Sequence, residues 1–110
     1  MTLELLYMSG CPHHGAAQDL VRTVLSEESI SVEFSETLIA TYGQAKELSF
    51  PGSPTFRVNG RDIEDVPRDH LHVGLACRTY LVDGRPKGIP PRAWLESALR
   101  RAQLSEEMSR

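Results

Sequence analysis

The residues best suited to covalent chemistry lie together near the start of the chain, in the segment Cys11-Pro12-His13-His14. A thiolate is the reactive form of cysteine, and an ordinary thiol is only about 3% ionised at pH 7. At a helix N-terminus a cysteine ionises more readily, because unpaired backbone N–H groups and the helix dipole stabilise negative charge. Cys11 is therefore the candidate nucleophile, and His13 and His14 are candidate hydrogen-bond donors to its sulfur.

The flanking pattern predicts that this segment joins a strand to a helix. Residues 3–8 form a short apolar run followed by Gly10, as expected for a buried strand that ends in a turn. From Pro12 onward, apolar residues recur at helical spacing up to the polar stretch 26–29. Pro12 suits the first helical position, which would make Cys11 the N-cap of the helix.

The rest of the chain predicts an element order of βαβαββα. A strand–helix–strand start implies a parallel pair of strands, and the Asn59-Gly60 dipeptide predicts a hairpin turn with an antiparallel edge. Residues 61–76 show no clear periodicity and are expected to form an irregular insertion before the last strand. The other expected elements are an outer strand at 31–35, a short helix at 41–48, a strand ending at Asn59, a strand at 78–82 and a closing helix from Pro91 with a frayed tail from Ser105.

Length and composition fit one globular domain over residues 1–110. The chain is 40% hydrophobic and 25% charged, enough to bury its own core. Its formal net charge of -3 is spread along the sequence without a Lys/Arg cluster, which argues against nucleic acid or a membrane surface as a partner. The N-terminus lacks a basic and apolar leader, and no segment approaches membrane-spanning length, so a cytoplasmic location is expected. With two cysteines, Cys11 and Cys77, no disulfide framework is expected.

Two local motifs in this element order resemble the thioredoxin-like fold, and the resemblance covers nearly the whole chain. Gly-Cys-Pro-His-His at 10–14 matches the family's place for the nucleophilic cysteine, and three of its residues match the Cys-Pro-His-Cys motif of periplasmic disulfide oxidases. Gly-Ser-Pro-Thr at 52–55 matches the loop in which the family places a cis-proline beside that cysteine. The chain more closely resembles small bacterial thioredoxin-family proteins that also carry a Gly-Leu-x-Cys-Arg segment, here residues 74–78.

This resemblance implies a mixed four-stranded sheet flanked by helices, with the insertion before the last strand. It assigns the nucleophile to Cys11 and contacts with substrate to Pro12, Ser53, Pro54 and Thr55, with a cis peptide bond between Ser53 and Pro54. The backbone of that loop would then lie exposed beside Cys11. A substrate segment could pair along it as an added strand.

His14 stands where dithiol members of the family carry their second cysteine. Thiol–disulfide exchange at Cys11 would then need a second thiol, from another protein, from glutathione or from Cys77, and the first two external sources are the expectation. The family topology would place Cys77 at the far end of the sheet unless the insertion alters this, and a packed strand-edge thiol is its simpler interpretation. No cofactor is expected, and the sequence leaves open the substrate, the oligomeric state and whether there is any turnover.

Two other functions remain open at this point. A non-catalytic binding module would keep the fold and the groove without a second cysteine. Handling of a soft metal or an organomercurial would use Cys11 and His14 together with His70 and His72, although this spacing matches no closed zinc motif and no metal ligand is assigned. The plain alternatives for single residues are exposed first-turn histidines, an inert buried Cys11 and an ordinary trans-proline at position 54.

Overall fold

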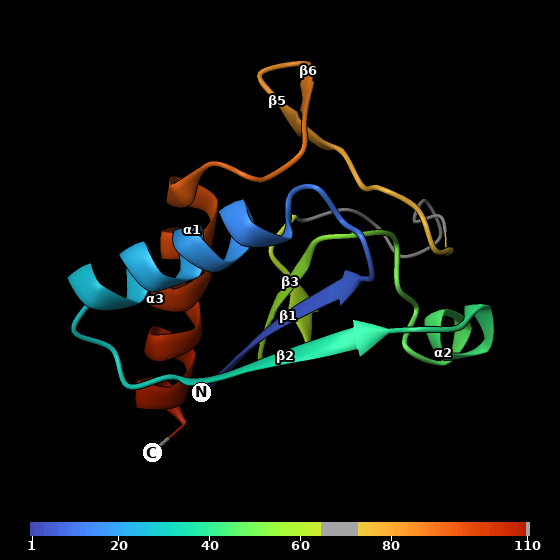
Figure 1. Ribbon diagram of the computed structural model, residues 1–110. Helices are drawn as coiled ribbons and strands as arrows, with labels where there is room; N and C mark the ends of the chain where they lie inside the picture. Colours follow the sequence, from blue (N-terminus) through green and yellow to red (C-terminus); the bar gives the residue numbers. More distant parts are fainter. Residues whose placement is uncertain (65–72, 110) are drawn as a thin grey trace.

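The structure is a computed structural model that describes residues 1–64 and 73–109, and within them the chain forms a mixed α/β domain (Figure 1). The fold contains a four-stranded sheet, a separate two-stranded hairpin and three helices in the described residues. The elements are β1 (Thr2–Met8), α1 (His14–Glu27), β2 (Glu33–Ile39), α2 (Tyr42–Glu47), β3 (Thr55–Val58), β4 (Arg61–Asp62), β5 (Tyr80–Val82), β6 (Arg85–Lys87) and α3 (Arg92–Met108).

The main sheet has the strand order β2-β1-β3-β4. β1 and β2 run parallel, whereas β3 runs antiparallel to β1 and β4 runs antiparallel to β3. The parallel pair and the antiparallel hairpin are both as predicted, and the hairpin turn uses Asn59 at φ 50° and Gly60 at φ 82°. Only residues that tolerate positive φ can close so tight a connection.

The fourth strand of this sheet is not the one that the sequence pattern predicted. The turn at Asn59-Gly60 returns the chain directly along β3, so Arg61 and Asp62 occupy the edge of the sheet as β4. In the described part of the chain, the predicted strand at 78–82 is shortened to β5, which pairs with β6 (Figure 1). The insertion therefore follows the fourth strand instead of preceding it.

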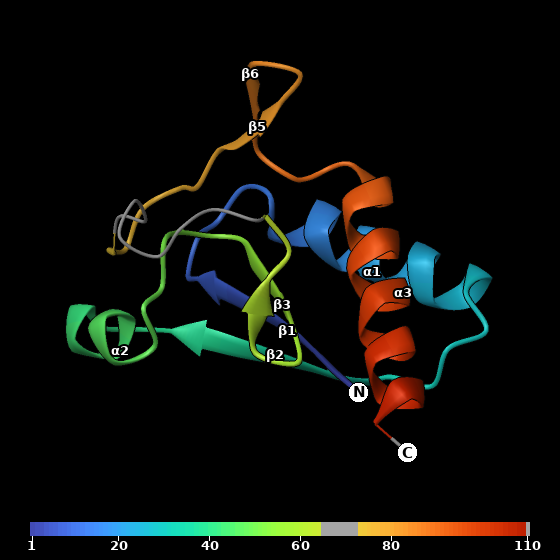
Figure 2. The same ribbon diagram turned by 180° about the vertical axis from the view of Figure 1, so that it is seen from behind.

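Helices α1 and α3 cover one face of the sheet, as the reverse view shows (Figure 2). Because side chains alternate along a strand, Leu3 and Leu5 point to this face while Leu6 points to the opposite one, where it packs near α2. Full burial of such a side chain contributes about 1.5–3 kcal/mol. The main core consists of Leu3, Leu5, Ala17, Val21, Val24, Phe56, Val58, Ile63, Tyr80, Leu95, Ala98 and Leu99.

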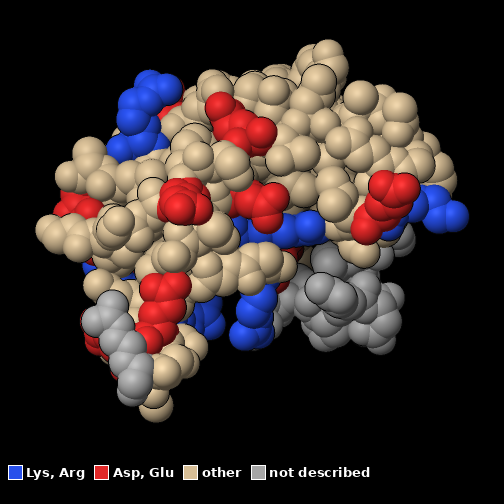
Figure 3. Space-filling model, turned by 90° about the horizontal axis from the view of Figure 1, so that it is seen from below, with Lys and Arg blue, Asp and Glu red and all other residues tan. Residues whose placement is uncertain are grey.

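The remaining predictions hold with shifted ends. The short helix α2 is confirmed, and the outer strand β2 is at the sheet edge but runs four residues further than the predicted end at Ser35. The closing helix α3 is confirmed, but it extends to Met108, so residues 105–108 are helical and the fraying expected from Ser105 is wrong. None of the described helices is long and apolar enough to cross a membrane. On the face seen in Figure 3, acidic and basic side chains are interspersed with uncharged ones.

Candidate functional site

Cys11 lies in a tight turn between β1 and α1, at the carboxyl end of β1. Its N–H donates to the carbonyl of Met8 at 3.3 Å, and its own carbonyl accepts from the N–H of His14 at 3.3 Å. The helix therefore begins at His14 with His13 as its N-cap, not with Cys11 as predicted. The helix starts later because the hydrogen bond from His14 to Cys11 closes a separate turn through Pro12, and the first helical hydrogen bond, from Ala17 to His13, comes after it. Cys11 is half-buried and its thiol is free.

The two histidines beside Cys11 contact different parts of the fold. The ring of His13 lies directly against Gly88, where a Cβ atom would overlap the ring. The ring of His14 stacks on Tyr7 with centroids 3.8 Å apart, and its Nε2 lies 2.9 Å from Oε1 of Glu36 on β2. Neither imidazole forms a hydrogen bond with the Cys11 sulfur in the described structure, so their proposed effect on the thiol would have to act through space.

The Gly-Ser-Pro-Thr loop is joined directly to the strand that precedes Cys11. The Ser53–Pro54 peptide bond is cis, as predicted. The Ser53 hydroxyl accepts a hydrogen bond of 3.1 Å from the N–H of Met8, and both Ser53 and Thr55 are fully buried. Cys11 and Pro54 thus belong to the same end of the sheet, as the resemblance implied.

The backbone of Ser53, however, is not open for a substrate strand. Its N–H donates to the carbonyl of Ala76 and its carbonyl accepts from the N–H of Arg78, both at 2.9 Å. Cys77 therefore stands opposite Ser53 in a parallel bridge. The predicted position of Cys77 at the far end of the sheet is wrong, because the segment after the insertion returns to the end where Cys11 lies. Cys77 is an exposed free thiol, not a packed one.

Arg78, next to Cys77, is the centre of a buried ionic network. Its guanidinium binds both oxygens of Asp62, at 2.5 and 2.8 Å, and also reaches Glu64 and the Thr55 hydroxyl, each at 3.1 Å. It lies 4.2 Å above the ring of Tyr80. Burial lowers the pKa of Arg78, but the hydrogen bonds and charges of Asp62, Tyr80 and Glu64 together outweigh this effect, so the pKa lies above its ordinary value.

Tyr80 and Thr55 complete this network by binding the proline loop itself. The Tyr80 hydroxyl donates to the Pro54 carbonyl at 2.6 Å, and the Thr55 hydroxyl donates to the Gly52 carbonyl at 2.6 Å. Burial raises the pKa of Tyr80. No buried side-chain polar atom in the described residues lacks a hydrogen-bond partner. The loop is thus held by the Thr55 hydroxyl from within and by Tyr80 and Arg78 from outside.

Sequence reasoning missed this network, although one signal pointed to it. Asp62 and Glu64 flank the apolar Ile63, so in an extended segment both carboxylates face the same side. Two carboxylates on one side favour a cationic partner, and the segment 74–78 contains one arginine. The sequence offered no means of pairing them across the insertion.

Only two of the four residues suggested for binding a soft metal, Cys11 and His14, belong to the described residues. His70 and His72 lie outside the described residues. Among residues 1–64 and 73–109, no group of three or more His, Cys, Asp or Glu side chains is arranged to hold a metal ion.

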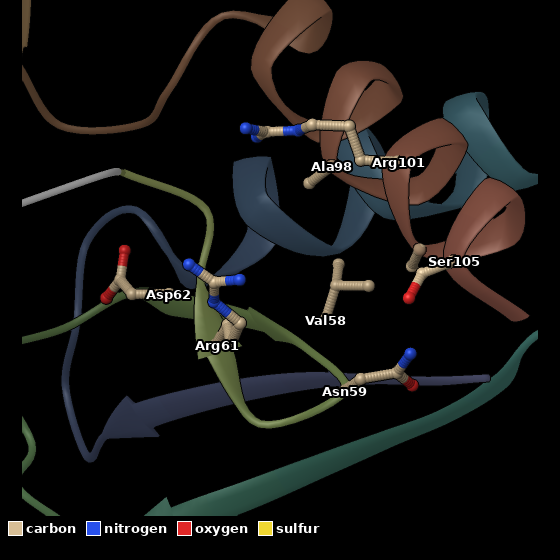
Figure 4. Close-up of a pocket in the computed structure, with 8 residues that line it drawn as sticks. Val58, Asn59, Arg61, Asp62, Ala98, Arg101 and Ser105 are labelled. Atoms are coloured by element: carbon tan, nitrogen blue, oxygen red, sulfur yellow. The ribbon is translucent and has the colours of Figure 1, made fainter. Parts of the chain in front are cut away.

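A surface hollow lies between the β3–β4 hairpin and α3, lined in part by Val58, Arg61 and Arg101 (Figure 4). It is at the other end of β1 from Cys11, since Asn59 on its rim donates its N–H to the carbonyl of Thr2 at 2.9 Å. The hollow is therefore separate from the thiol site.

Comparisons of the chain with models of known protein families, with curated proteins and with solved structures find no match. The likeness to thioredoxin-family proteins accordingly stays a prediction.

Proposed function

We propose that this chain is a thioredoxin-like protein that performs thiol–disulfide exchange through Cys11. The observation that supports this most is the placement of a free, half-buried thiol before α1, at the end of the sheet where the cis Ser53–Pro54 loop is bound to Met8. A turn between a strand and a helix is where reactive groups are commonly presented.

The proposed chemistry needs Cys11 to attack one sulfur of a disulfide as a thiolate, releasing the other sulfur as a thiol. Helix α1 begins three residues after Cys11, and the positive end of its dipole favours negative charge nearby. Because position 14 holds histidine, the mixed disulfide on Cys11 has no second cysteine in the same turn. A thiol of another protein or of glutathione is one source of the second thiol.

A non-catalytic binding module is the second candidate function. It is favoured by the pairing of Ser53 with Ala76 and Arg78, which already uses the backbone groups that a substrate strand would need. Such a module would keep Cys11 without exchanging it.

Competitive alkylation distinguishes the two candidates. Cys77 is exposed and Cys11 only half-buried, so access alone would give faster labelling of Cys77. We expect iodoacetamide at about pH 6.5 to label Cys11 first, because labelling follows the thiolate population. Peptide mass spectrometry of the wild type, with Cys11→Ser as control, measures both rates. Faster labelling of Cys77 would instead support the binding module.

A gain-of-function variant tests the geometry of the turn. His14 follows Cys11 by three residues in a hydrogen-bonded turn, which brings the two Cα atoms to within about 7 Å, the range of a disulfide. His14→Cys should therefore form an internal disulfide and reduce insulin. The matched control is His13→Cys, since residues two apart at a helix start do not face each other. An introduced thiol at 14 that never pairs under mild oxidant would argue against an oxidoreductase-like turn.

A further inference from the structure

Both cysteines of the chain lie at one end of the sheet, although they are far apart in sequence. Hydrogen bonds connect them in steps. The Cys11 N–H donates to the Met8 carbonyl, the Met8 N–H donates to the Ser53 hydroxyl, and the Ser53 backbone bonds the residues that flank Cys77. Figure 1 shows the turn after β1 and the segment leading to β5 at the same end. Two strand spacings, about 10 Å, separate Met8 from Cys77.

The contact between Ser53 and Cys77 is built into the fold. Gly52 has φ 135°, and a Cβ atom there would lie 3.1 Å from the Ala76 carbonyl oxygen, so only glycine lets segment 76–78 approach this closely. Arg78 fixes the segment by its buried bonds to Asp62. Successive side chains in an extended segment point to opposite sides, so Cys77 faces away from the buried network and is exposed.

From this placement we infer that Cys77 is the resolving thiol for Cys11. The inference rests on the proposed exchange function of Cys11. It selects Cys77, which the sequence left as an alternative, over the external resolving thiol that the sequence favoured. Segment 76–78 lies along the loop edge that a substrate strand was expected to use, and it carries a cysteine at the position opposite Ser53.

The reaction has two exchange steps. The Cys11 thiolate attacks a small disulfide such as oxidised glutathione, forms a mixed disulfide, and releases one glutathione thiolate, which takes up a proton. The Cys77 thiolate then attacks the Cys11 sulfur, the bond between Cys11 and glutathione breaks, and the second glutathione leaves as a thiolate that is also protonated. Two protein thiols are oxidised to one Cys11–Cys77 disulfide, and one glutathione disulfide is reduced to two thiols.

Formation of this bond requires a modest movement. The two Cα atoms must come within roughly 7 Å. The turn before Cys11 contains Gly10 at φ 76° with no atom within 4 Å of its Cβ position, so this turn has room to shift. The movement is expected in this turn, because segment 76–78 is fixed by its main-chain hydrogen bonds to Ser53 and by the bonds of Arg78 to Asp62.

The test follows oxidised glutathione on the reduced full chain by intact mass and peptide mapping after acid quenching. Wild type should lose two hydrogen atoms and retain little glutathione. Cys77→Ser should accumulate one glutathione on Cys11, and Cys11→Ser should form no internal bond. A matched control combines Cys77→Ser with Ser29→Cys: Ser29 is exposed beyond the far end of α1, about 21 Å of helix from Cys11, so this variant should accumulate glutathione like Cys77→Ser.

The outcomes separate the two proposals. Equal glutathione accumulation in wild type and Cys77→Ser overturns the resolving role while leaving exchange at Cys11 intact. A Cys77→Ser protein that never acquires glutathione at Cys11 refutes the exchange function itself. A disulfide that forms between chains, seen as a dimer on a non-reducing gel and reduced in yield on dilution, also overturns the internal pairing.

Discussion

Replacing Arg78 with methionine should destabilise the fold by about 3–5 kcal/mol, the usual cost of removing one partner from a buried ion pair. Arg78 is only 5% exposed, and the carboxylates of Asp62 and Glu64 beside it are themselves largely buried. Methionine fills much of the same volume, so the loss comes chiefly from leaving two carboxylates without their cation.

The magnitude follows from the contacts that disappear. Three hydrogen bonds join the guanidinium to charged oxygens of Asp62 and Glu64, each worth about 1.5–3 kcal/mol, and the desolvation of Arg78 offsets part of their sum. A loss of 3–5 kcal/mol is a large fraction of the 5–15 kcal/mol that typically stabilises a domain. Arg78→Lys should also be costly, because an ammonium cannot bind Asp62 in a bidentate manner.

Urea unfolding followed by fluorescence of Trp94 measures this loss, since Trp94 contacts the ring of Tyr80 within the core. The matched control is Arg100→Met on the surface of α3, where the side chain is 58% exposed and pairs with Glu28. That change should cost about 0–1 kcal/mol.

A second variant separates the charge effect from simple loss of packing. Adding Asp62→Asn and Glu64→Gln to Arg78→Met removes the uncompensated charges and should recover part of the lost stability. If Arg78→Met costs less than about 1 kcal/mol, or if neutralising both carboxylates recovers nothing, the buried network does not hold the proline loop in the way described.

Two further predictions concern the same region. Burial raises the pKa of Tyr80, so above about pH 10 the unfolded chain releases a proton that the folded chain keeps, and the free energy of unfolding should fall by about 1.4 kcal/mol per pH unit. Urea unfolding of Tyr80→Phe across the same pH range should lack this slope. The same dependence of stability on pH in wild type and Tyr80→Phe would contradict the raised pKa of Tyr80. Gly52→Ala should cost at least about 1–3 kcal/mol in thermal or urea unfolding, because the residue has φ 135° and its Cβ would press on Ala76 and Arg78. The control is Gly43→Ala in α2, where a Cβ would meet only the Thr41 hydroxyl at 4.0 Å; this change should be neutral or slightly stabilising. Equal effects at both glycines would show that segment 76–78 does not approach Gly52 closely.

Elements with strong local signals could be predicted from the sequence. The apolar run before Cys11, the helical spacing after it and the Asn59-Gly60 turn each specify local backbone structure, and all three are present. The cis bond at Pro54 was predicted from the motif in which it lies. The start of α1 was placed too early, because a hydrogen-bonded turn through Pro12 and the start of a helix look alike in sequence.

The sequence by itself determined the strand–turn–helix unit that presents Cys11 and the hairpin that follows Pro54, since both depend on residues close together in the chain. Tertiary structure alone decided where Cys77 and Arg78 lie. Their partners Ser53 and Asp62 are separated from them by the insertion. Neither hydrophobic periodicity nor residue spacing predicts which distant part of the backbone the segment after the insertion will pair with. Hydrogen bonding to Ser53 and the burial of Arg78 against Asp62 fix that segment, and these interactions exist only after the chain has folded back on itself.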